Sequence, residues 1–157
     1  MTLSIPEQPH KQTRSDHWER IWQEPSNSLG GYYHKWLHRV YGFVIPKGVR
    51  VLELGCGSGD LLASLLPEYG VGIDFATSAI AKARQSHPGL RFEVMDAEAV
   101  KLGSEQFDFI ILSDLVNDIR DVQAVLEGLK PCCHSGTKLV VNFYSHPNAF
   151  PELAYGS

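Results

Sequence analysis

The chain has 157 residues, of which 43% are hydrophobic and 20% are charged. It is long enough to bury the core of one ordinary domain and too apolar to be disordered. A net charge of −4 argues against general nucleic-acid binding, and no uncharged apolar run approaches the ~20 residues that span a bilayer. We expect a cytoplasmic protein without a secretion signal, a nucleic-acid partner or membrane insertion.

The cysteines Cys56, Cys132 and Cys133 give no disulfide framework, because their number is odd and adjacent cysteines rarely form a bridge. We expect reduced thiols. Cys132, Cys133 and His134 are neighbours, but no second ligand pair occurs at the spacing of a zinc site. We therefore expect no metal.

The N-terminal region is expected to be helical after a polar start. Residues 1–14 are polar, contain two prolines and predict a flexible tail. A helix with an apolar face is predicted from Ser15, and a second over residues 32–43, with Gly30-Gly31 as a flexible joint between them. We expect residues 15–46 to form a helical lid segment ahead of the core.

From residue 47 to residue 145 short apolar runs alternate with amphipathic segments. Strands are predicted at 49–54, 71–74, 90–95, 107–112 and 137–144, and helices at 60–66, at 77–86 with Thr77 as the cap, and at 122–129. The fourth run is so apolar that both its faces must be covered. The alternation predicts an α/β fold, a Rossmann-like, doubly wound, mostly parallel sheet of about five strands.

The first predicted strand opens directly into a glycine loop, Gly55-Cys56-Gly57-Ser58-Gly59. Glycines let the backbone turn sharply and approach a ligand, and the helix that follows directs N–H groups and partial positive charge at an anionic group. A dinucleotide loop would have its third glycine at position 60, where Asp60 would repel a pyrophosphate. The zwitterion of S-adenosylmethionine suits the loop better, and Glu53 adds negative charge near its cationic end.

Polar residues follow the next strands, at the edge where such sheets bind ligands. Asp74 is placed where a carboxylate can accept hydrogen bonds from both ribose hydroxyls of an adenosine, and Phe75 beside it can pack on the adenine face. Asp96, beside Ala97, suits an acceptor for the adenine amino group, and the segment 113–115 lines the far wall. The predicted cofactor-binding residues are Glu53, Gly55, Cys56, Gly57, Gly59, Asp74, Phe75, Asp96, Ala97 and Ser113.

Four segments resemble motifs of the class I S-adenosylmethionine-dependent methyltransferases, namely VLELGCGSGD at 51–60, VGIDFA at 71–76, VMDA at 94–97 and FDFIILSD at 107–114. The resemblance covers residues 30–145. It implies S-adenosylmethionine as the cofactor and methyl transfer to a small-molecule, sugar or lipid-linked acceptor. Within the family, segments 32–34 and 112–118 are most similar to methyltransferase domains that bacteria fuse to glycosyltransferases.

The chain departs from the family at its C-terminal end. The family usually completes a seven-stranded sheet, whereas this chain lacks the sixth and seventh strands and closes with a proline-containing tail at 146–157. We expect a fragment or a shortened form. In a shortened form the fifth strand is an unprotected edge, which invites pairing with another chain. We therefore expect a homodimer through that edge or through the N-terminal aromatic helices.

Methyl transfer from a sulfonium mainly requires that the acceptor atom is placed behind the methyl carbon and that water is excluded. A base is needed only where the acceptor loses a proton. The catalytic candidates are His34 as a base, with Asn117, Asn142 and Tyr144 at strand ends, and the substrate or lid candidates are Tyr32, Tyr33 and Asp118. Structural roles stay open for these residues, such as helix capping by Asp118 and strand packing by Tyr144.

Two other functions stay open. Because the last strands are missing, the chain could be a truncated, non-catalytic module that binds the cofactor or a partner. A nicotinamide-dependent oxidoreductase could have the same fold, although Asp60 and the glycine spacing count against it. Calorimetry with both cofactors and an acceptor screen would distinguish these functions.

Overall fold

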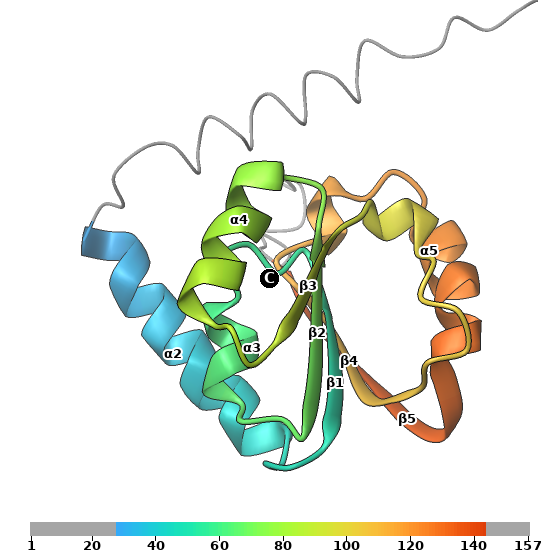
Figure 1. Cartoon of the computed structure of the whole chain (residues 1–157), viewed down its shortest axis with the longest axis horizontal. Coiled ribbons are helices and arrows are strands. Elements are labelled where there is room, and N and C mark those ends of the chain that lie inside the picture. The colour runs from blue at the N-terminus through green and yellow to red at the C-terminus, as the bar shows by residue number, and fades with distance from the viewer. Residues whose placement is uncertain (1–27, 144–157) are drawn as a thin grey trace, which may run out of the picture.

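The computed structural model describes residues 28–143, in which helices alternate with strands (Figure 1). The helices are α2 (Ser28–Val44), α3 (Asp60–Ser64), α4 (Thr77–Ser86) and α5 (Val122–Leu129). The strands are β1 (Arg50–Leu54), β2 (Tyr69–Asp74), β3 (Arg91–Val94), β4 (Phe107–Ser113) and β5 (Cys133–Asn142). Short 3₁₀ helices lie at η1 (Ala97–Ala99), η2 (Val116–Asp118) and η3 (Lys130–Cys132).

The strands form one 5-stranded parallel sheet in the order β3-β2-β1-β4-β5. The chain order reverses beside β1, because β2 and β3 extend the sheet on one side and β4 and β5 on the other. Helices α2, α3 and α4 lie on one face and α5 on the other (Figure 1). The predicted Rossmann-like fold is confirmed. In such sheets ligands bind at the carboxyl ends of the strands where the strand order reverses, which here is beside β1.

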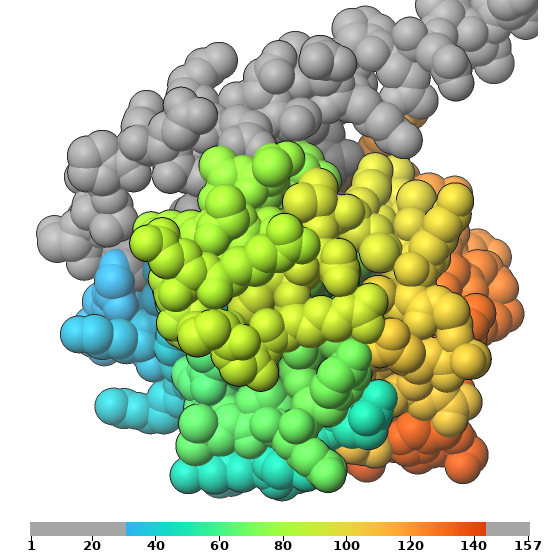
Figure 2. Space-filling view, in the orientation of Figure 1, coloured from blue at the N-terminus to red at the C-terminus, as the bar shows by residue number. Residues whose placement is uncertain are grey.

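Two apolar cores, one on each face, hold the sheet between the helices. Val51 and Ile111 belong to the core on the side of α2, α3 and α4, whereas their neighbours Leu52 and Ile110 belong to the core on the side of α5. Successive side chains of a strand point to opposite faces, so β1 and β4 are buried on both, as their continuous apolar runs predict. In the space-filling view α4 and the chain that follows β3 largely hide the sheet (Figure 2).

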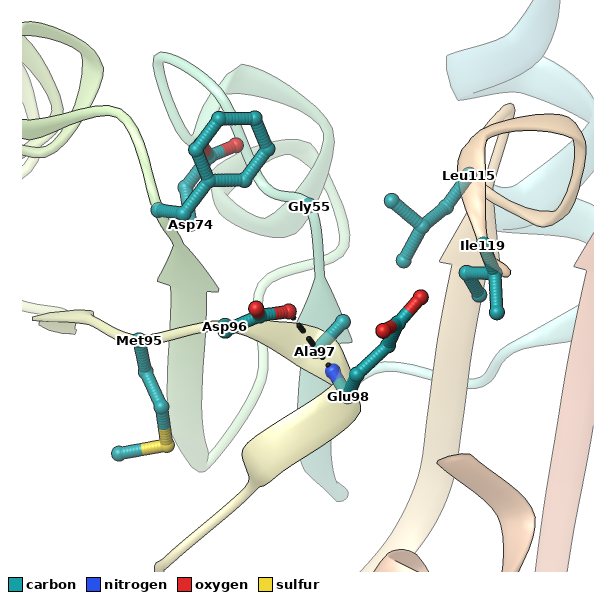
Figure 3. A pocket seen from close by; sticks show the side chains of 9 residues that line it. Gly55, Asp74, Met95, Asp96, Ala97, Glu98, Leu115 and Ile119 are labelled. Carbon is teal, nitrogen blue, oxygen red and sulfur yellow. Dashed lines mark hydrogen bonds between the residues drawn. The ribbon is translucent and has the colours of Figure 1, made fainter. Parts of the chain in front are cut away.

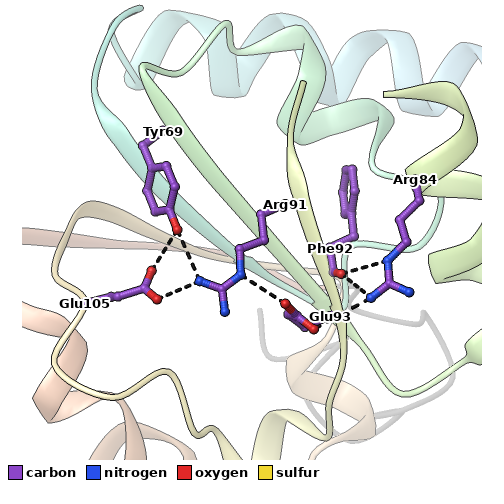
Figure 4. Close-up of polar contacts among 6 residues, drawn as sticks. All are labelled: Tyr69, Arg84, Arg91, Phe92, Glu93 and Glu105. Atoms are coloured by element: carbon purple, nitrogen blue, oxygen red, sulfur yellow. Dashed lines mark hydrogen bonds and ion pairs between the residues drawn. The ribbon is translucent and has the colours of Figure 1, made fainter. Parts of the chain in front are cut away.

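A network of charged side chains holds β3 at one edge of the sheet (Figure 4). The Arg91 guanidinium donates to Glu105 (2.6 Å), Glu93 (3.0 Å) and the Tyr69 hydroxyl (3.2 Å). These hydrogen bonds, that to Tyr69 first, raise the pKa of Arg91. Each pair is partly exposed and contributes modestly to stability. Together they connect the amino ends of β2 and β3 to the segment before β4.

The structure corrects three local predictions. Gly30 and Gly31 are not a joint, because α2 runs through both as one helix. Thr77 is the first residue of α4 rather than its cap, since Ala76 occupies the cap position without a side-chain hydrogen bond. β5 begins at Cys133 rather than at residue 137, because Cys133 pairs with Phe107 ahead of a register shift in β4. His134 thus lies within β5. The helix predicted from Ser15 lies outside the described residues.

Candidate functional site

A hollow open to solvent lies at the carboxyl ends of β1, β2, β3 and β4, with about 290 Å³ of empty space. Its lining residues are Gly55, Asp74, Phe75, Met95, Asp96, Ala97, Glu98, Leu115 and Ile119 (Figure 3). The predicted cofactor residues Gly55, Asp74, Phe75, Asp96 and Ala97 are therefore brought together. Leu115 belongs to the segment 113–115 that was predicted to line the far wall. Met95, Glu98 and Ile119 were not predicted, and Glu98 points across the hollow toward Leu115 and Ile119 (Figure 3).

The glycine loop adopts a backbone that requires glycine. Gly55, Gly57 and Gly59 have φ angles of 69°, 53° and 76°, in the left-handed region that other residues rarely adopt. A Cβ on Gly55 would lie 2.9 Å from Cδ1 of Leu115. The loop is thus packed closely between the β4 tip and the sheet, and its backbone rather than its side chains faces the hollow.

Gly59 provides a test of this packing. A Cβ there would lie 2.5 Å from Cζ of Phe92, so Gly59→Ala should lower the free energy of unfolding by about 2–4 kcal/mol through strain and overpacking. The matched control is Gly128→Ala, because Gly128 lies in α5 with nothing near its missing Cβ. That control should raise stability by up to ~1 kcal/mol. Equal effects of the two substitutions in urea unfolding would contradict the loop geometry.

Asp74 anchors the glycine loop to the tip of β2. Its buried carboxylate accepts hydrogen bonds from the backbone N–H groups of Gly57 and Ala76, both at 2.9 Å. An ionised carboxylate has about four acceptor positions, as a residue that both anchors a loop and accepts from a ligand hydroxyl would need. Asp74 also lines the hollow, which its predicted contact with a ribose requires.

Asp96, which follows β3, also both holds the backbone and lines the hollow. Its Oδ1 accepts from the backbone N–H of Glu98 at 2.9 Å and so caps η1 (Figure 3). Glu98 in turn accepts from the backbone N–H of Arg120 at 2.7 Å, which fastens η1 to the chain after η2. These bonds set the shape of the wall opposite the glycine loop.

Glu53 is a buried carboxyl group beneath the glycine loop, and its side chain is only 2% exposed. In the part of the chain that the structure describes, its Oε2 is a buried side-chain oxygen with no hydrogen-bond partner. Burial raises the pKa of Glu53 well above its ordinary value, more than a hydrogen bond with the Leu62 backbone lowers it, and nearby Asp74 and Asp60 raise it further. A cationic group beside Glu53 would lower this pKa and favour the ionised carboxylate.

Asp60 does not face the loop's ligand side as the sequence suggested. Its carboxylate accepts from the Ser58 hydroxyl at 2.6 Å and contacts the His87 imidazole at 2.8 Å. Despite the opposing effect of partial burial, which acts most strongly, these contacts keep the pKa of Asp60 below its usual value. Asp60 therefore links the start of α3 to the end of α4, and its repulsion of a pyrophosphate is a weaker argument than the sequence indicated.

A second polar group, Tyr33, Tyr41, Asp114 and Asn142, joins α2 to the tips of β4 and β5. We call it the tyrosine–carboxylate cluster. The Tyr33 hydroxyl donates to both oxygens of Asp114, at 2.9 and 3.0 Å, and the Asn142 amide donates to Asp114 at 2.6 Å. The Tyr41 hydroxyl donates to the Asn142 carbonyl oxygen. Burial raises the pKa of Tyr41 to about 12, so this hydroxyl keeps its proton.

The comparison with known families agrees with this geometry. A family model described as a methyltransferase domain matches residues 45–155. The chain belongs to this family. The resemblance to class I S-adenosylmethionine-dependent methyltransferases is thereby confirmed.

Two curated relatives and one solved structure illustrate the similarity of this methyltransferase domain. It is 29% identical over 126 residues to the 2-phytyl-1,4-naphtoquinone methyltransferase of Thermosynechococcus vestitus, over 74% of this chain and 56% of that protein. It is 37% identical over 111 residues to a malonyl-acyl-carrier-protein O-methyltransferase of Bacillus cereus, over 67% of this chain and 40% of that protein. The chain thus spans about half the length of these relatives.

Among solved structures, the domain resembles an S-adenosylmethionine dependent methyltransferase from Mesorhizobium loti, with a TM-score of 0.58 and 25% identity. The match covers 64% of this chain and 49% of that one. In residues 28–143 of the methyltransferase domain, no helix is long and apolar enough to cross a membrane. Nor does this part of the chain group three or more metal-ligating side chains.

The other predicted site residues lie apart from the hollow. Cys56 is buried, and burial raises the pKa of its thiol, so it is packed rather than reactive. Of the catalytic and lid candidates, the methyltransferase domain brings Tyr33 and Asn142 into the tyrosine–carboxylate cluster. His34 and Tyr32 lie exposed on α2, Asn117 and Asp118 lie in η2, and Tyr144 lies outside the described residues.

Proposed function

We propose that this chain is the cofactor-binding core of an S-adenosylmethionine-dependent methyltransferase that acts on a small-molecule, sugar or lipid-linked acceptor. The observation that carries the proposal is the buried Glu53 oxygen without a partner among the described residues, directly before a glycine loop whose first residue, Gly55, lines a hollow together with Asp74 and Asp96. The activities for which the relatives are named, those of a naphtoquinone methyltransferase and a malonyl-acyl-carrier-protein O-methyltransferase, support a small or carrier-bound acceptor.

The residues present fit S-adenosylmethionine. Glu53 offers an acceptor to its ammonium group, the loop 55–59 offers close backbone approach, and Asp74 offers acceptor capacity for ribose hydroxyls. Phe75 and Asp96 at neighbouring strand tips suit the adenine face and its amino group. When bound, the cofactor supplies an electrophilic methyl group on a good leaving group.

The chain's own contribution to the reaction is then placement. The glycine loop and Asp74 fix the cofactor half of the site, because Asp74 holds the loop backbone through Gly57. Leu115 packs against Gly55 from the β4 tip. Correct placement alone lowers the barrier of such a displacement substantially. We also keep His34 and Asn117 as candidate contacts to the acceptor, beside the cluster residue Tyr33.

The direct experiment is calorimetric titration of the folded chain with S-adenosylhomocysteine and, separately, with a nicotinamide dinucleotide. We expect binding of the first and none of the second at matched concentration. Preference for the dinucleotide would favour the oxidoreductase, and absence of S-adenosylhomocysteine binding at millimolar concentration would remove the proposal. Cofactor binding without methyl transfer in an acceptor screen would favour the truncated binding module.

We further propose that the chain forms a homodimer through the β5 edge. β5 lies at the end of the sheet order, and Leu139 and Val141 are 44% and 41% exposed on its face away from α2. Two copies related by a two-fold axis would pair this edge with itself. Val141→Lys should shift the mass in sedimentation equilibrium to that of a monomer. The control is Val94→Lys on the opposite edge strand, β3, where Val94 is 47% exposed. A monomeric wild type at all concentrations would remove this proposal.

A further inference from the structure

The order of the strand tips suggests where the methyl acceptor binds. Asp96, Asp74 and Gly55 follow β3, β2 and β1, and Asp114 follows β4. Neighbouring strands are about 4.8 Å apart, so adenine, ribose and methionine would occupy successive tips up to β1. The next tips along the sheet, β4 and β5, are therefore the floor for whatever receives the methyl group. This step rests on the proposed function.

Asp114 is the charged group at that position. Its backbone has φ 52°, a left-handed conformation that Asp tolerates better than most residues. The next residue, Leu115, lines the hollow and packs against Gly55, so Asp114 lies in the chain directly before the wall of the predicted cofactor site. Three hydrogen bonds from Tyr33 and Asn142 fix the orientation of the carboxylate.

The Tyr33 hydroxyl shows what chemistry this carboxylate accepts. Tyr33 is a phenol from α2, half-buried and stacked on Trp36, and its O–H donates to both oxygens of Asp114. A hydroxyl group on an acceptor is equivalent to this O–H and could replace it. A carboxylate acceptor would instead bring a second negative charge to Asp114, which is unfavourable in a partly buried site.

We propose that Asp114 accepts a hydrogen bond from the acceptor's hydroxyl group, whose oxygen is the atom that is methylated. The acceptor is therefore a phenol or alcohol rather than a carboxylate. Asp114 takes the proton while the hydroxyl oxygen uses an electron pair to form the new carbon–oxygen bond. The carbon–sulfur bond breaks and its electron pair stays on sulfur, which leaves an ether and a neutral thioether. The proton then passes from Asp114 to water. Asn142 is a positioning residue in this step, and the Tyr33 hydroxyl gives up its place on Asp114 to the acceptor.

The test uses two probes with the same ring, catechol and benzoate, titrated into the chain saturated with S-adenosylhomocysteine. The wild type should bind catechol at least tenfold more tightly than benzoate. Asp114→Asn should remove most of this preference, and Tyr33→Phe should tighten catechol binding several-fold because the competing hydroxyl is gone. A merely structural Tyr33 would give weaker binding. The matched control is Asp121→Asn at the N-cap of α5, where Asn caps a helix as well as Asp does, and it should leave both affinities unchanged.

The binding of S-adenosylhomocysteine is measured first in every variant, together with the circular dichroism spectrum. Failure to bind it in the wild type overturns the proposed function itself. If the cofactor product binds, equal affinity for the two probes, no binding of catechol at millimolar concentration, or weaker catechol binding by Tyr33→Phe overturns the role of Asp114. Because Tyr33→Phe keeps the aromatic ring and its packing, its catechol affinity tests the role of Asp114 even if Asp114→Asn does not fold.

Discussion

Asp74→Ala should weaken the binding of S-adenosylhomocysteine by about 1–3 kcal/mol, through loss of charge-assisted hydrogen bonds to the ribose. The same substitution should also destabilise the fold. It leaves the buried N–H groups of Gly57 and Ala76 without the acceptor that they have now, at 2.9 Å each, and each such loss costs about 1–3 kcal/mol. Isothermal titration and urea unfolding measure the two effects separately.

A pair of ligands separates the ribose contact from the loop anchor. Adenosine has both ribose hydroxyls, and 2′,3′-dideoxyadenosine has neither. The wild type should bind adenosine more tightly than the dideoxy compound, and Asp74→Ala should reduce this preference. A distorted loop would instead lower the affinity for both ligands equally. An unchanged preference in the variant would show that Asp74 only anchors the loop to β2.

The site on the cofactor side could be predicted because its signals are local. A strand that ends in glycines gives the loop, and acidic residues directly after the next two strands give Asp74 and Asp96. Parallel strands bring their carboxyl ends to one edge, so sequence position alone placed these residues together. Glu98 and Ile119 lack such a signal, because they reach the hollow through the turns η1 and η2.

The tyrosine–carboxylate cluster depends on contacts that are far apart in the chain. Tyr33 and Asp114 are separated by 81 positions, and Tyr41 and Asn142 by 101. Their convergence requires that α2 packs across β4 and β5, which follows from the strand order and not from any local pattern.

The ends of elements were also hard to predict. β5 starts early only because Thr137 accepts from the His134 backbone and donates to the Phe107 carbonyl, which sustains the pairing.

Glu53→Gln is expected to make the protein more stable and to impair cofactor binding. Burial raises the pKa of Glu53 above its ordinary value of 4.5, so between these two pKa values the folded state holds a proton that the unfolded state releases. The contribution of this group is thus fully present below about pH 4.5 and is lost as the pH rises toward the folded pKa. Relative to Glu53→Gln, the wild type should lose up to ~1.4 kcal/mol of unfolding free energy per pH unit in this window.

The binding experiment tests the same carboxyl group from the side of the ligand. The ammonium of S-adenosylhomocysteine should draw Glu53 into its ionised form, so binding to the wild type should release a proton, and its heat should depend on the ionisation enthalpy of the buffer. Glu53→Gln should show no such dependence and at least tenfold weaker binding, since a buried cation would lose its charged partner. Parallel unfolding curves for the two proteins from pH 5 to pH 8, with equal affinities, would contradict this role. The two experiments together therefore separate the cost of this carboxyl group to the empty fold from its contribution to ligand binding.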